Sequence, residues 1–465
     1  MRQILAFLLL CAALAACDTG ETPVTEAPPS STITTTTETA TSPTAEDEVT
    51  TTTTLDSPLE ARLAWLAGVF ETGELSESEY SSTFTADFIE NVPYDDFVAV
   101  VEQLATEGTG WSVGEYEERD GTSATVLIVA GSGDAIRANI ALETVVPHRI
   151  AGLLIQPAEQ PTLEDPPADL EEAADRVAGM GTLEMAVFDV TEGSCEAVFE
   201  HGSGSAAPVA SAFKLYVLAA VADAVGSGEL EWDDEVTIIE DLKSIPTGVL
   251  QDEEEGETFS VREVAETMIA FSDNTGTDHL IDLVGRGSVE EAFSDYGMAD
   301  PSLNIPLMDT MDLAALKVGP ASGLATQWLD GDDEQRRAIL DQISDIRPSD
   351  IPLSEFDQPI LPDRIEWFAT PADMCRVLTA LWDKGEPLTQ ILTINPGLPD
   401  EEGAFETVAF KGGSEPGMTA MNWLVERPDG RIFMLAGSIV NPEEEIDQLQ
   451  AVLLFGAARD LLADL

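Results

Sequence analysis

Basic residues are scarce in this chain of 465 residues, where 21 Lys and Arg stand against 88 Asp and Glu and the net charge is −67. Such a surface repels nucleic-acid phosphates and anionic lipid head groups, which excludes the usual electrostatic routes to either partner. Lysine is especially rare, so a lysine close to a nucleophile is a specific signal. The lysines are Lys214, Lys243, Lys317, Lys384 and Lys411.

Cysteine and histidine are also sparse. His148, His201 and His279 are scattered, without Cys or His neighbours in ligand register, so we expect no metal site and no cofactor. Cys195 and Cys375 lie in the part of the chain that we expect to fold. A disulfide between them is open to an exported protein, but one pair is no disulfide framework, and we expect two buried small apolar side chains instead.

The first 17 residues, MRQILAFLLLCAALAAC, combine one Arg, an apolar run and small residues. This is the pattern of a secretory signal peptide, and it is too short for a spanning helix. The tetrad from Leu14 to Cys17 resembles a bacterial lipobox, which implies a lipidated Cys17 and an anchor to the outer face of the cell membrane. Each buried CH₂ of such an anchor contributes about 0.8 kcal/mol without any basic patch. Plain secretion, with cleavage after a small residue, is the alternative.

Composition then divides the chain into a tether and a first folded unit. Residues 18–57 are rich in Thr, Ser, Pro and Glu, which predicts a disordered tether. In residues 58–160, Leu59, Leu63 and Leu66 recur at helical spacing, and YDDFVAVVEQLATEG carries a second apolar stripe. The segments from WSVGEYEERD to HRIAGLLIQPA alternate with a period of two, which is typical of antiparallel strands. Helices followed by strands predict a small α+β domain, in which we find no catalytic set.

A second unit is expected at residues 169–465, after the linker TLEDPPADLEEA. LEMAVFDVT and CEAVFEHG predict a hairpin, and SAFKLYVLAAVADAV and VREVAETMIAFS predict helices. Strand patterns return in TVAFKGGSE and TAMNWLVERPDGRIFMLAGSIV, before a final helix. Strands at both ends of a unit, with helices between them, predict one sheet built from both ends and covered by helices.

Residues 211–214, SAFK, place a lysine one helical turn after a serine. At a helix N-terminus Ser211 gains from the local positive charge, and Lys214 lies on the same face. Burial of that face would favour the neutral amine, which can accept a proton and activate the hydroxyl as a nucleophile. The alternative is a capping serine beside a lysine that extends to solvent, which is the commoner meaning of an isolated Ser-x-x-Lys.

Two further motifs follow in order. Residues 272–274 are Ser-Asp-Asn, and residues 411–414 are Lys-Gly-Gly-Ser at the end of a strand pattern. Ser-x-x-Lys, Ser-Asp-Asn and Lys-Thr-Gly form the ordered signature of class A β-lactamases and penicillin-binding proteins, which residues 180–465 therefore resemble. The segment ATPADMCRVLTALW also resembles the helix that follows the omega loop in that family. The resemblance implies a β-lactamase-like α/β sandwich and a serine hydrolase.

The first unit adds a second resemblance. FTADFIENVPYDDFVAVVEQL and PHRIAGLLIQP are similar to the N-terminal domain of a two-domain actinobacterial lipoprotein group. That group pairs a cystatin- or steroid-isomerase-like domain with a β-lactamase-like domain and includes a protein of clavam biosynthesis clusters. The resemblance implies the same pairing here.

The resemblance implies a role for each catalytic residue. Ser211 would attack an acyl carbonyl, with Lys214 as its base or as part of the proton relay. Ser272 would pass a proton to the leaving amine. Lys411 would hold a substrate carboxylate and lower the local potential for Ser272. The backbone N–H groups of Ser211 and Ser414 would form the oxyanion hole, at about 3–4 kcal/mol per donor in other hydrolases.

The implied substrate-binding residues are Asn274, Gly412, Gly413 and Ser414. Asn274 would bind the substrate amide or help to position Lys214. Gly412 is a departure, because it replaces the threonine of the third motif. The family's Glu-x-x-Leu-Asn motif, whose glutamate activates the deacylating water, is absent from the sequence. Asp300 begins a similar run one methylene short, and Glu355 lies nearer the ATPADM segment, but neither matches the motif.

These residues support acylation better than fast deacylation. We therefore expect an exported serine acyl-hydrolase that forms an acyl-enzyme on Ser211 with β-lactam or related amide or ester substrates, and releases it slowly. The alternatives are a penicillin-binding D,D-peptidase or esterase, and a catalytically silent binding lipoprotein. The expected partners are a small β-lactam, peptide or ester and the membrane through the lipid anchor alone, with no nucleic acid. Residues 317–365 are either a surface helical insertion or a segment that narrows the pocket.

Overall fold

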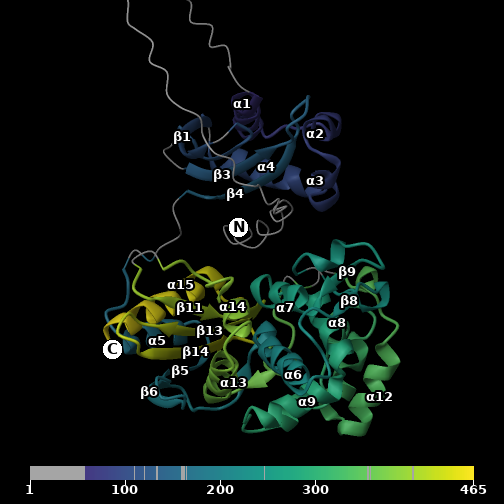
Figure 1. The fold of residues 1–465 in the computed structure, drawn as a ribbon, viewed down its shortest axis with the longest axis vertical. Helices are drawn as coiled ribbons and strands as arrows, with labels where there is room; N and C mark the ends of the chain where they lie inside the picture. Colours follow the sequence, from purple (N-terminus) through teal and green to yellow (C-terminus); the bar gives the residue numbers. More distant parts are fainter. Residues whose placement is uncertain are drawn as a thin grey trace, which may run out of the picture. The chain divides into compact units, whose positions relative to one another are not determined.

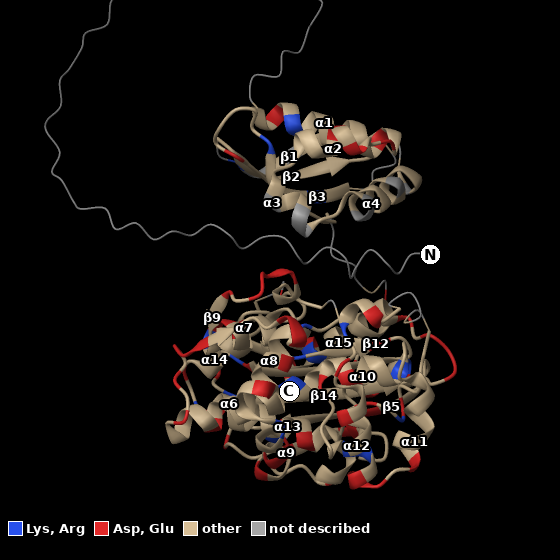
Figure 2. Ribbon diagram, turned by 90° about the vertical axis from the view of Figure 1, so that its right-hand side faces the viewer, with Lys and Arg blue, Asp and Glu red and all other residues tan. Residues whose placement is uncertain are grey.

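The computed structural model describes residues 58–108, 110–119, 121–131, 135–158, 163, 165–245, 247–352, 356, 358–400 and 403–465. The predicted signal peptide, Cys17 and the tether lie outside the described residues. The chain forms two compact units that divide between residues 160 and 161 (Figure 1). Acidic side chains are spread over the helices and loops of both units (Figure 2).

Helices precede a four-stranded antiparallel sheet in the N-terminal unit, which confirms the predicted α+β class. The sheet order is β1-β2-β3-β4, and β2 and β3 alternate buried with less buried residues, as period-two sequences should. The elements are α1 (Pro58–Thr72), α2 (Glu77–Thr83), α3 (Ala86–Asn91), α4 (Tyr94–Glu107), β1 (Ser112–Arg119), β2 (Ser123–Val129), β3 (Ala135–Leu142) and β4 (Ile150–Pro157).

The C-terminal unit contains the longer list of elements. Its helices include α5 (Leu170–Ala178), α6 (Lys214–Ser227), α7 (Val261–Ala270), α8 (Asn274–Val284), α9 (Arg286–Asp295), α10 (Thr310–Lys317), α11 (Ala325–Asp330), α12 (Asp333–Ile343), α13 (Pro371–Asp383), α14 (Leu388–Thr393) and α15 (Gln448–Asp460). Its strands include β5 (Thr182–Asp189), β6 (Glu196–His201), β7 (Ala207–Pro208), β8 (Glu235–Thr237), β9 (Thr258–Ser260), β10 (Phe368–Ala369), β11 (Thr407–Phe410), β12 (Gly413–Glu415), β13 (Met418–Glu426) and β14 (Ile432–Val440).

The central sheet joins the two ends of this unit, as the sequence predicts. Its order is β11-β13-β14-β5-β6, all antiparallel, with β12 paired to β13. Helices α5 and α15 pack on one face, and α6 and α13 lie in the apolar core on the other (Figure 1). Because both faces are covered, β13 is buried along almost its whole length instead of alternating.

Helix α6 is the central helix of this unit. Residues Ala210–Ser227 are long and apolar enough to cross a membrane by composition, but 67% of this stretch is buried inside the protein core. A helix that is apolar all round is stable in such a core. The helix ends at Gly228, whose φ of 79° favours glycine. Its first residue, Lys214, is therefore a lysine at the edge of an apolar core.

Cys195 and Cys375 form a disulfide with a Cα–Cα separation of 6.2 Å. The prediction of two separate small apolar side chains is therefore wrong. The two residues lie 180 positions apart, and only the fold brings the turn before β6 to the side of α13. Closing so long a loop restricts the unfolded chain and stabilises this unit.

Candidate functional site

Ser211 lies in a 3₁₀ turn, η1 (Ala210–Phe213), which leads directly into α6. The preceding residue, Ala210, has a φ of 42°, a left-handed value that is uncommon for a residue with a side chain. Ala210 is held there by a small buried cluster with Met418, Ala420 and Val440. A strained backbone conformation of this kind persists only where the surrounding packing maintains it. Residues held in this way concentrate at functional sites.

The Lys214 side chain is wholly buried beneath this turn and reaches the second motif. Its Nζ donates to the Ser272 carbonyl at 2.5 Å and to Asn274 Oδ1 at 2.7 Å, and it lies 3.3 Å from Ser272 Oγ. Burial lowers the pKa of Lys214 to about 7, although the charges of Asp273 and Asp278 oppose the shift. Near neutral pH, Lys214 can therefore both accept and release a proton.

Lys411 reaches the same hydroxyl from the sheet. Its Nζ donates to Ser272 Oγ at 3.0 Å and to the Gly412 carbonyl at 2.8 Å. Burial, together with the charge of Lys214, holds the pKa of Lys411 well below its ordinary value. Because two ammonium groups around one hydroxyl repel each other, the pair favours a state with fewer protons. Side chains from all three predicted motifs therefore meet at the Ser272 hydroxyl.

Asp273 orients its neighbours by capping helix α8. One carboxylate oxygen accepts from the Gly276 N–H at 2.7 Å, and the other accepts from the N–H groups of Val249 and Leu250. Ser272 adopts a φ of 57° at this corner. With Asp273 fixed, the side chains on either side of it turn toward Lys214, so the middle residue of Ser-Asp-Asn is structural.

Asn274 is held by a second contact. Its Nδ2 donates to Thr247 Oγ1 at 2.8 Å, which leaves Oδ1 facing the Lys214 amine. This arrangement matches the positioning role that the resemblance implies for Asn274, which stays a prediction.

Strand β12 lies against the turn that carries Ser211. A side chain on Gly413 would place its Cβ 2.5 Å from the Ser211 backbone nitrogen and 2.4 Å from the Val209 carbonyl oxygen. Only glycine allows so close an approach. Gly413 therefore brings the backbone of Ser414 near that of Ser211, where two N–H groups can face one oxyanion.

Gly412 replaces threonine for a reason that the structure supplies. A Cβ on Gly412 would lie 2.6 Å from Cζ of the Phe410 ring and 3.3 Å from Met421 Sδ. The Phe410 ring also fills the position that a side chain on Gly397 would take, and it packs on Trp423. Phe410 thus occupies the space that a side chain at position 412 would take, and it packs against the apolar cluster that includes Trp423 and residues of α15.

The two carboxylates considered for deacylation have different outcomes. Asp300 is exposed and caps a short 3₁₀ turn, η4 (Pro301–Asn304), by accepting from the Ser302 N–H at 3.2 Å and from its hydroxyl at 2.5 Å. This carboxylate is engaged in a local turn, which argues against a role as water-activating base. Glu355 lies outside the described residues. The described part of the 317–365 segment includes helices α11 and α12 and two 3₁₀ turns, η5 (Ser322–Leu324) and η6 (Pro348–Asp350).

Sequence reasoning missed a buried triad beside the third motif. Lys317, Glu366 and Glu415 come from α10, the segment before β10 and the end of β12. The rarity of lysine was the available signal, because Lys317 is one of the few that the chain contains.

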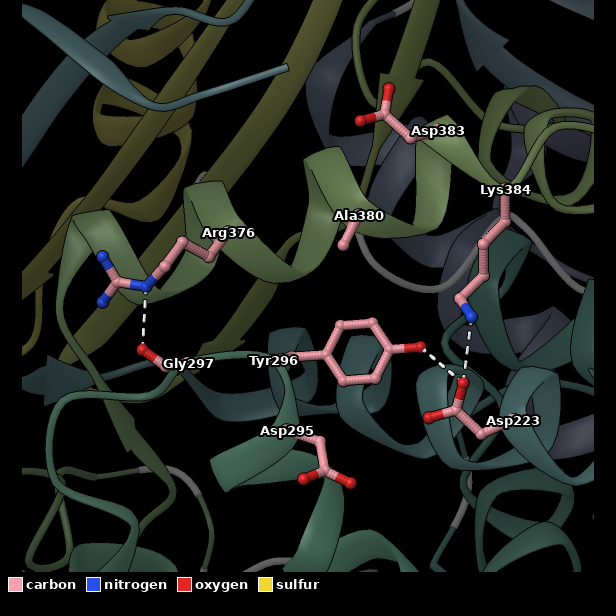
Figure 3. Close-up of a pocket in the computed structure, with 8 residues that line it drawn as sticks. All are labelled: Asp223, Asp295, Tyr296, Gly297, Arg376, Ala380, Asp383 and Lys384. Atoms are coloured by element: carbon pink, nitrogen blue, oxygen red, sulfur yellow. Dashed lines mark hydrogen bonds and ion pairs between the residues drawn. The ribbon is translucent and has the colours of Figure 1, made fainter.

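One surface depression is lined by none of the predicted site residues. This depression, of about 680 Å³ (Figure 3), is lined by residues of α6, α9 and α13, where Asp223 accepts from Tyr296 and Lys384. These bonds link three helices, so the cluster is structural. Within the described residues, Glu171, Asp175 and His201 place ligand atoms within 4.8 Å of one another. That group is largely exposed and belongs to α5 and β6, not to the Ser211 site.

Comparisons with known proteins agree with the motifs. Residues 169–393 match the model of the beta-lactamase enzyme family, and residues 54–144 match the model of the ORF 12 gene product N-terminal domain. The chain is similar to a solved beta-lactamase from Sphaerobacter thermophilus DSM 20745, with 21% identity, 63% of this chain and 95% of that one covered, and a TM-score of 0.46.

Two further solved structures are similar at lower identity. PBP-A is 18% identical, with 64% of this chain and 98% of that one covered and a TM-score of 0.42. A beta-lactamase from Chitinophaga pinensis DSM 2588 is 18% identical, with 63% and 98% covered and a TM-score of 0.43. A search of curated proteins finds no match. The likeness of the C-terminal unit to this family therefore rests on the match to the family model and on the order of the motifs.

Proposed function

Since residues 169–393 match the model of the beta-lactamase enzyme family, we propose that this protein is a serine acyl-hydrolase that forms an acyl-enzyme on Ser211. Its substrates are β-lactams or related amides and esters. One observation carries the proposal: the buried amines of Lys214 and Lys411 both reach the Ser272 hydroxyl, at 3.3 and 3.0 Å. A capping serine and a solvated lysine would need no such arrangement.

The proposed mechanism gives each of these groups one step. Neutral Lys214 takes the proton of the Ser211 hydroxyl as the oxygen attacks the acyl carbonyl carbon. The backbone N–H groups of Ser211 and Ser414 bind the resulting oxyanion. As the carbon–nitrogen bond breaks, Ser272 gives its proton to the leaving amine and is reprotonated from Lys214. The products are an ester on Ser211 and a free amine, or an alcohol from an ester substrate.

Deacylation is slow in this proposal. A second base must activate water to cleave the acyl-enzyme, and Asp300 is committed to the turn that it caps. Among the described residues, Lys214 is a candidate for that base, because it lies one helical turn from Ser211 and has a pKa of about 7. The acyl-enzyme then persists, as in a penicillin-binding D,D-peptidase or a slow esterase, which is the second candidate function that this observation favours.

The site operates outside the cytoplasm in this proposal. The signal-like N-terminus and the tether would hold the protein by a lipid on Cys17 at the outer face of the cell membrane. The disulfide between Cys195 and Cys375 supports export, because disulfides persist in oxidising compartments.

Intact-protein mass spectrometry tests the proposal directly. The wild-type protein and Ser211→Ala are mixed with a penicillin and with a cephalosporin, and adduct mass is followed over time. We expect an adduct on the wild type that decays slowly and is absent from the variant. An adduct that forms equally on Ser211→Ala would refute the nucleophile. Rapid loss with accumulating product would show an efficient β-lactamase and overturn the slow deacylation.

A further inference from the structure

A buried charged cluster lies beside the third motif. Lys317, the last residue of α10, donates to the carboxylate of Glu415 and lies 3.6 Å from Glu366 Oε1. The side chains of Lys317 and Glu366 are 0% and 1% exposed, and that of Glu415 is 10% exposed. Taking three ionisable groups out of water costs several kcal/mol per ion before they are paired. Such a cluster needs a reason beyond stability.

Glu415 connects this cluster to the oxyanion donors. It directly follows Ser414 on β12, a three-residue strand paired with β13, and its carbonyl accepts from Gln448 at 2.8 Å. Gly413, at the start of β12, lies so close to the Ser211 backbone nitrogen that a side chain at this position would collide with it. Because β12 is short, it makes few backbone hydrogen bonds to β13. The ion pair between Lys317 and Glu415 at its end therefore contributes much of what holds the strand in place.

Glu366 connects the cluster to the nucleophile from the other side. Its Oε2 accepts from the Trp367 N–H at 2.9 Å. The Trp367 ring stacks on Phe213, with centroids 3.7 Å apart, and its carbonyl accepts from the Val209 N–H at 2.9 Å. Phe213 and Val209 each lie two positions from Ser211. The cluster therefore holds both the turn that carries Ser211 and the strand that carries Ser414.

The charge of the cluster depends on Glu366. Burial raises the pKa of Glu366 to about 8, with Lys317 opposing the shift and the negative Glu415 adding to it. Its Oε1 has no hydrogen-bond partner, which fits a carboxyl that is neutral at pH 7. Above about pH 8 the Glu366 carboxyl thus adds a negative charge beside the ion pair of Lys317 and Glu415.

Charged groups face Glu366 from several elements. Lys317 and Glu415 are its closest partners, from α10 and β12. Asp363 and Arg364 precede Glu366 on its own segment. Asp333 and Arg336 of α12 line a cavity together with these three residues. None of these residues carries a predicted catalytic role.

We propose that Lys317 and Glu415 are positioning residues for the oxyanion hole. A negative charge on Glu366 competes with Glu415 for Lys317, and so weakens the ion pair that holds the end of β12 in place. The inference rests on the proposed acyl-transfer function. It assigns these residues no contact with substrate. A displacement of about 1 Å in such a donor can cost about 100-fold in rate, so a modest shift of β12 is sufficient.

The experiment compares acylation rates of Glu366→Gln, the double variant Lys317→Met/Glu415→Gln and the wild type from about pH 6 to about pH 10. The double variant removes both charges together, because a lone buried charge would unfold the protein. Two probes are used: a penicillin, and a fluorophosphonate that labels an activated serine without needing a particular substrate. Lys384→Gln is the matched control, because it removes an exposed lysine whose ion pair, with Asp223, involves none of the three cluster residues. Thermal unfolding of each variant shows that it is folded.

The expected results separate positioning from simple packing. Wild-type acylation rises through pH 7 and falls above pH 8, following the pKa values of Lys214 and Glu366. Glu366→Gln, which imitates the protonated carboxyl, keeps its rate and is about tenfold faster than the wild type at pH 9. The double variant stays folded and is about 10-fold to 100-fold slower at pH 7.5 with both probes.

Each contrary result has one meaning. An alkaline fall shared by Glu366→Gln and the wild type, or a folded double variant that reacts at the wild-type rate, overturns the positioning role. Labelling by the fluorophosphonate without reaction with penicillin refutes the proposed substrate class and still tests the cluster. Failure of both probes on the wild type refutes an activated Ser211, and with it this inference.

Discussion

The two units of this chain bury different kinds of side chain. The N-terminal unit has an apolar and aromatic core, and Thr83 is the one buried residue of polar or charged type among those whose burial the structure describes there. The C-terminal unit buries many. They include Glu184, Lys214, Asp273, Asp278, Lys317, Glu366, Asp373, Lys411 and Arg459.

This difference separates packing from chemistry. Buried ionisable groups destabilise a fold unless they are paired. Burial also shifts their pKa values, and a shifted pKa is useful in an active site but contributes nothing to a structural scaffold. The N-terminal unit avoids that cost, whereas the C-terminal unit accepts it around Ser211. Changes in the two units should therefore affect stability and acylation in opposite ways.

The largest effect is expected for Lys214→Met. Without an amine to accept the Ser211 proton, acylation should slow by about 10³-fold or more in the adduct assay. Stability should move the other way. The folded pKa of Lys214 is about 7 against an ordinary 10.5, so the unfolded chain binds more protons between these values. The penalty for burying the charge is complete below pH 7 and disappears as the pH rises toward 10.5.

Thermal unfolding of Lys214→Met checks the sign. The variant should gain melting temperature over the wild type at pH 6, and the gain should shrink by pH 10. A gain that grows with pH would contradict the lowered pKa.

Phe84→Ala should produce the complementary result. Phe84 contacts the rings of Trp65, Tyr80, Phe88 and Phe97 in the N-terminal core, and its loss should lower the free energy of unfolding of that unit by about 3–5 kcal/mol. Denaturant unfolding measures the loss. The initial acylation rate at 20 °C should equal that of the wild type, with Phe84→Leu as a milder control. A slowed rate in folded protein would show that the units are coupled.

Gly412→Thr should have a smaller effect, within the site. The new side chain collides with the Phe410 ring, so acylation by penicillin should slow by about tenfold. The double variant Phe410→Ala/Gly412→Thr removes the collision and should recover most of the rate, whereas Phe410→Ala alone should not exceed the wild type. A double variant as slow as Gly412→Thr would show that the ring is not the obstacle. Adduct formation by mass spectrometry measures all three.

The smallest effect is expected for Lys384→Gln in the depression of Figure 3. Its ion pair with Asp223 is partly exposed on both sides, and such pairs contribute about 1 kcal/mol or less. The melting temperature should change by only a few degrees, and acylation not at all. A large loss of acylation would mean that this cluster belongs to the site.

Much of this molecule was predictable from local pattern. Period-two alternation predicted the strands of the N-terminal sheet. Strand patterns at the two ends of the C-terminal unit predicted that both ends contribute to one sheet. Such predictions succeed because the formation of strands follows the local pattern of side chains closely. Ser211, Lys214, Ser272 and Lys411 could be named from motifs, although their catalytic roles stay predictions. What could not be predicted depends on contacts between distant segments. The pairing of Cys195 with Cys375 and the match of Phe410 to Gly412 need the folded backbone.

The triad of Lys317, Glu366 and Glu415 was missed for the same reason. Each residue is ordinary in its own segment, and burial alone makes the set unusual. Glu366 is one acidic residue among 88, so composition gave no sign that its carboxyl would be buried without a hydrogen bond to Oε1.

The disulfide between Cys195 and Cys375 makes the order of biosynthesis matter. The bond joins α13 to the turn before β6, so the covalently complete protein exists only after its thiols have met an oxidant. Chains that fold in a reducing cytoplasm carry two thiols, heavier by two hydrogens, and lack one tie between the helix layer and the sheet. A preparation from that source would be a different material from the oxidised protein, and its shelf life and heat resistance would reflect the missing bond.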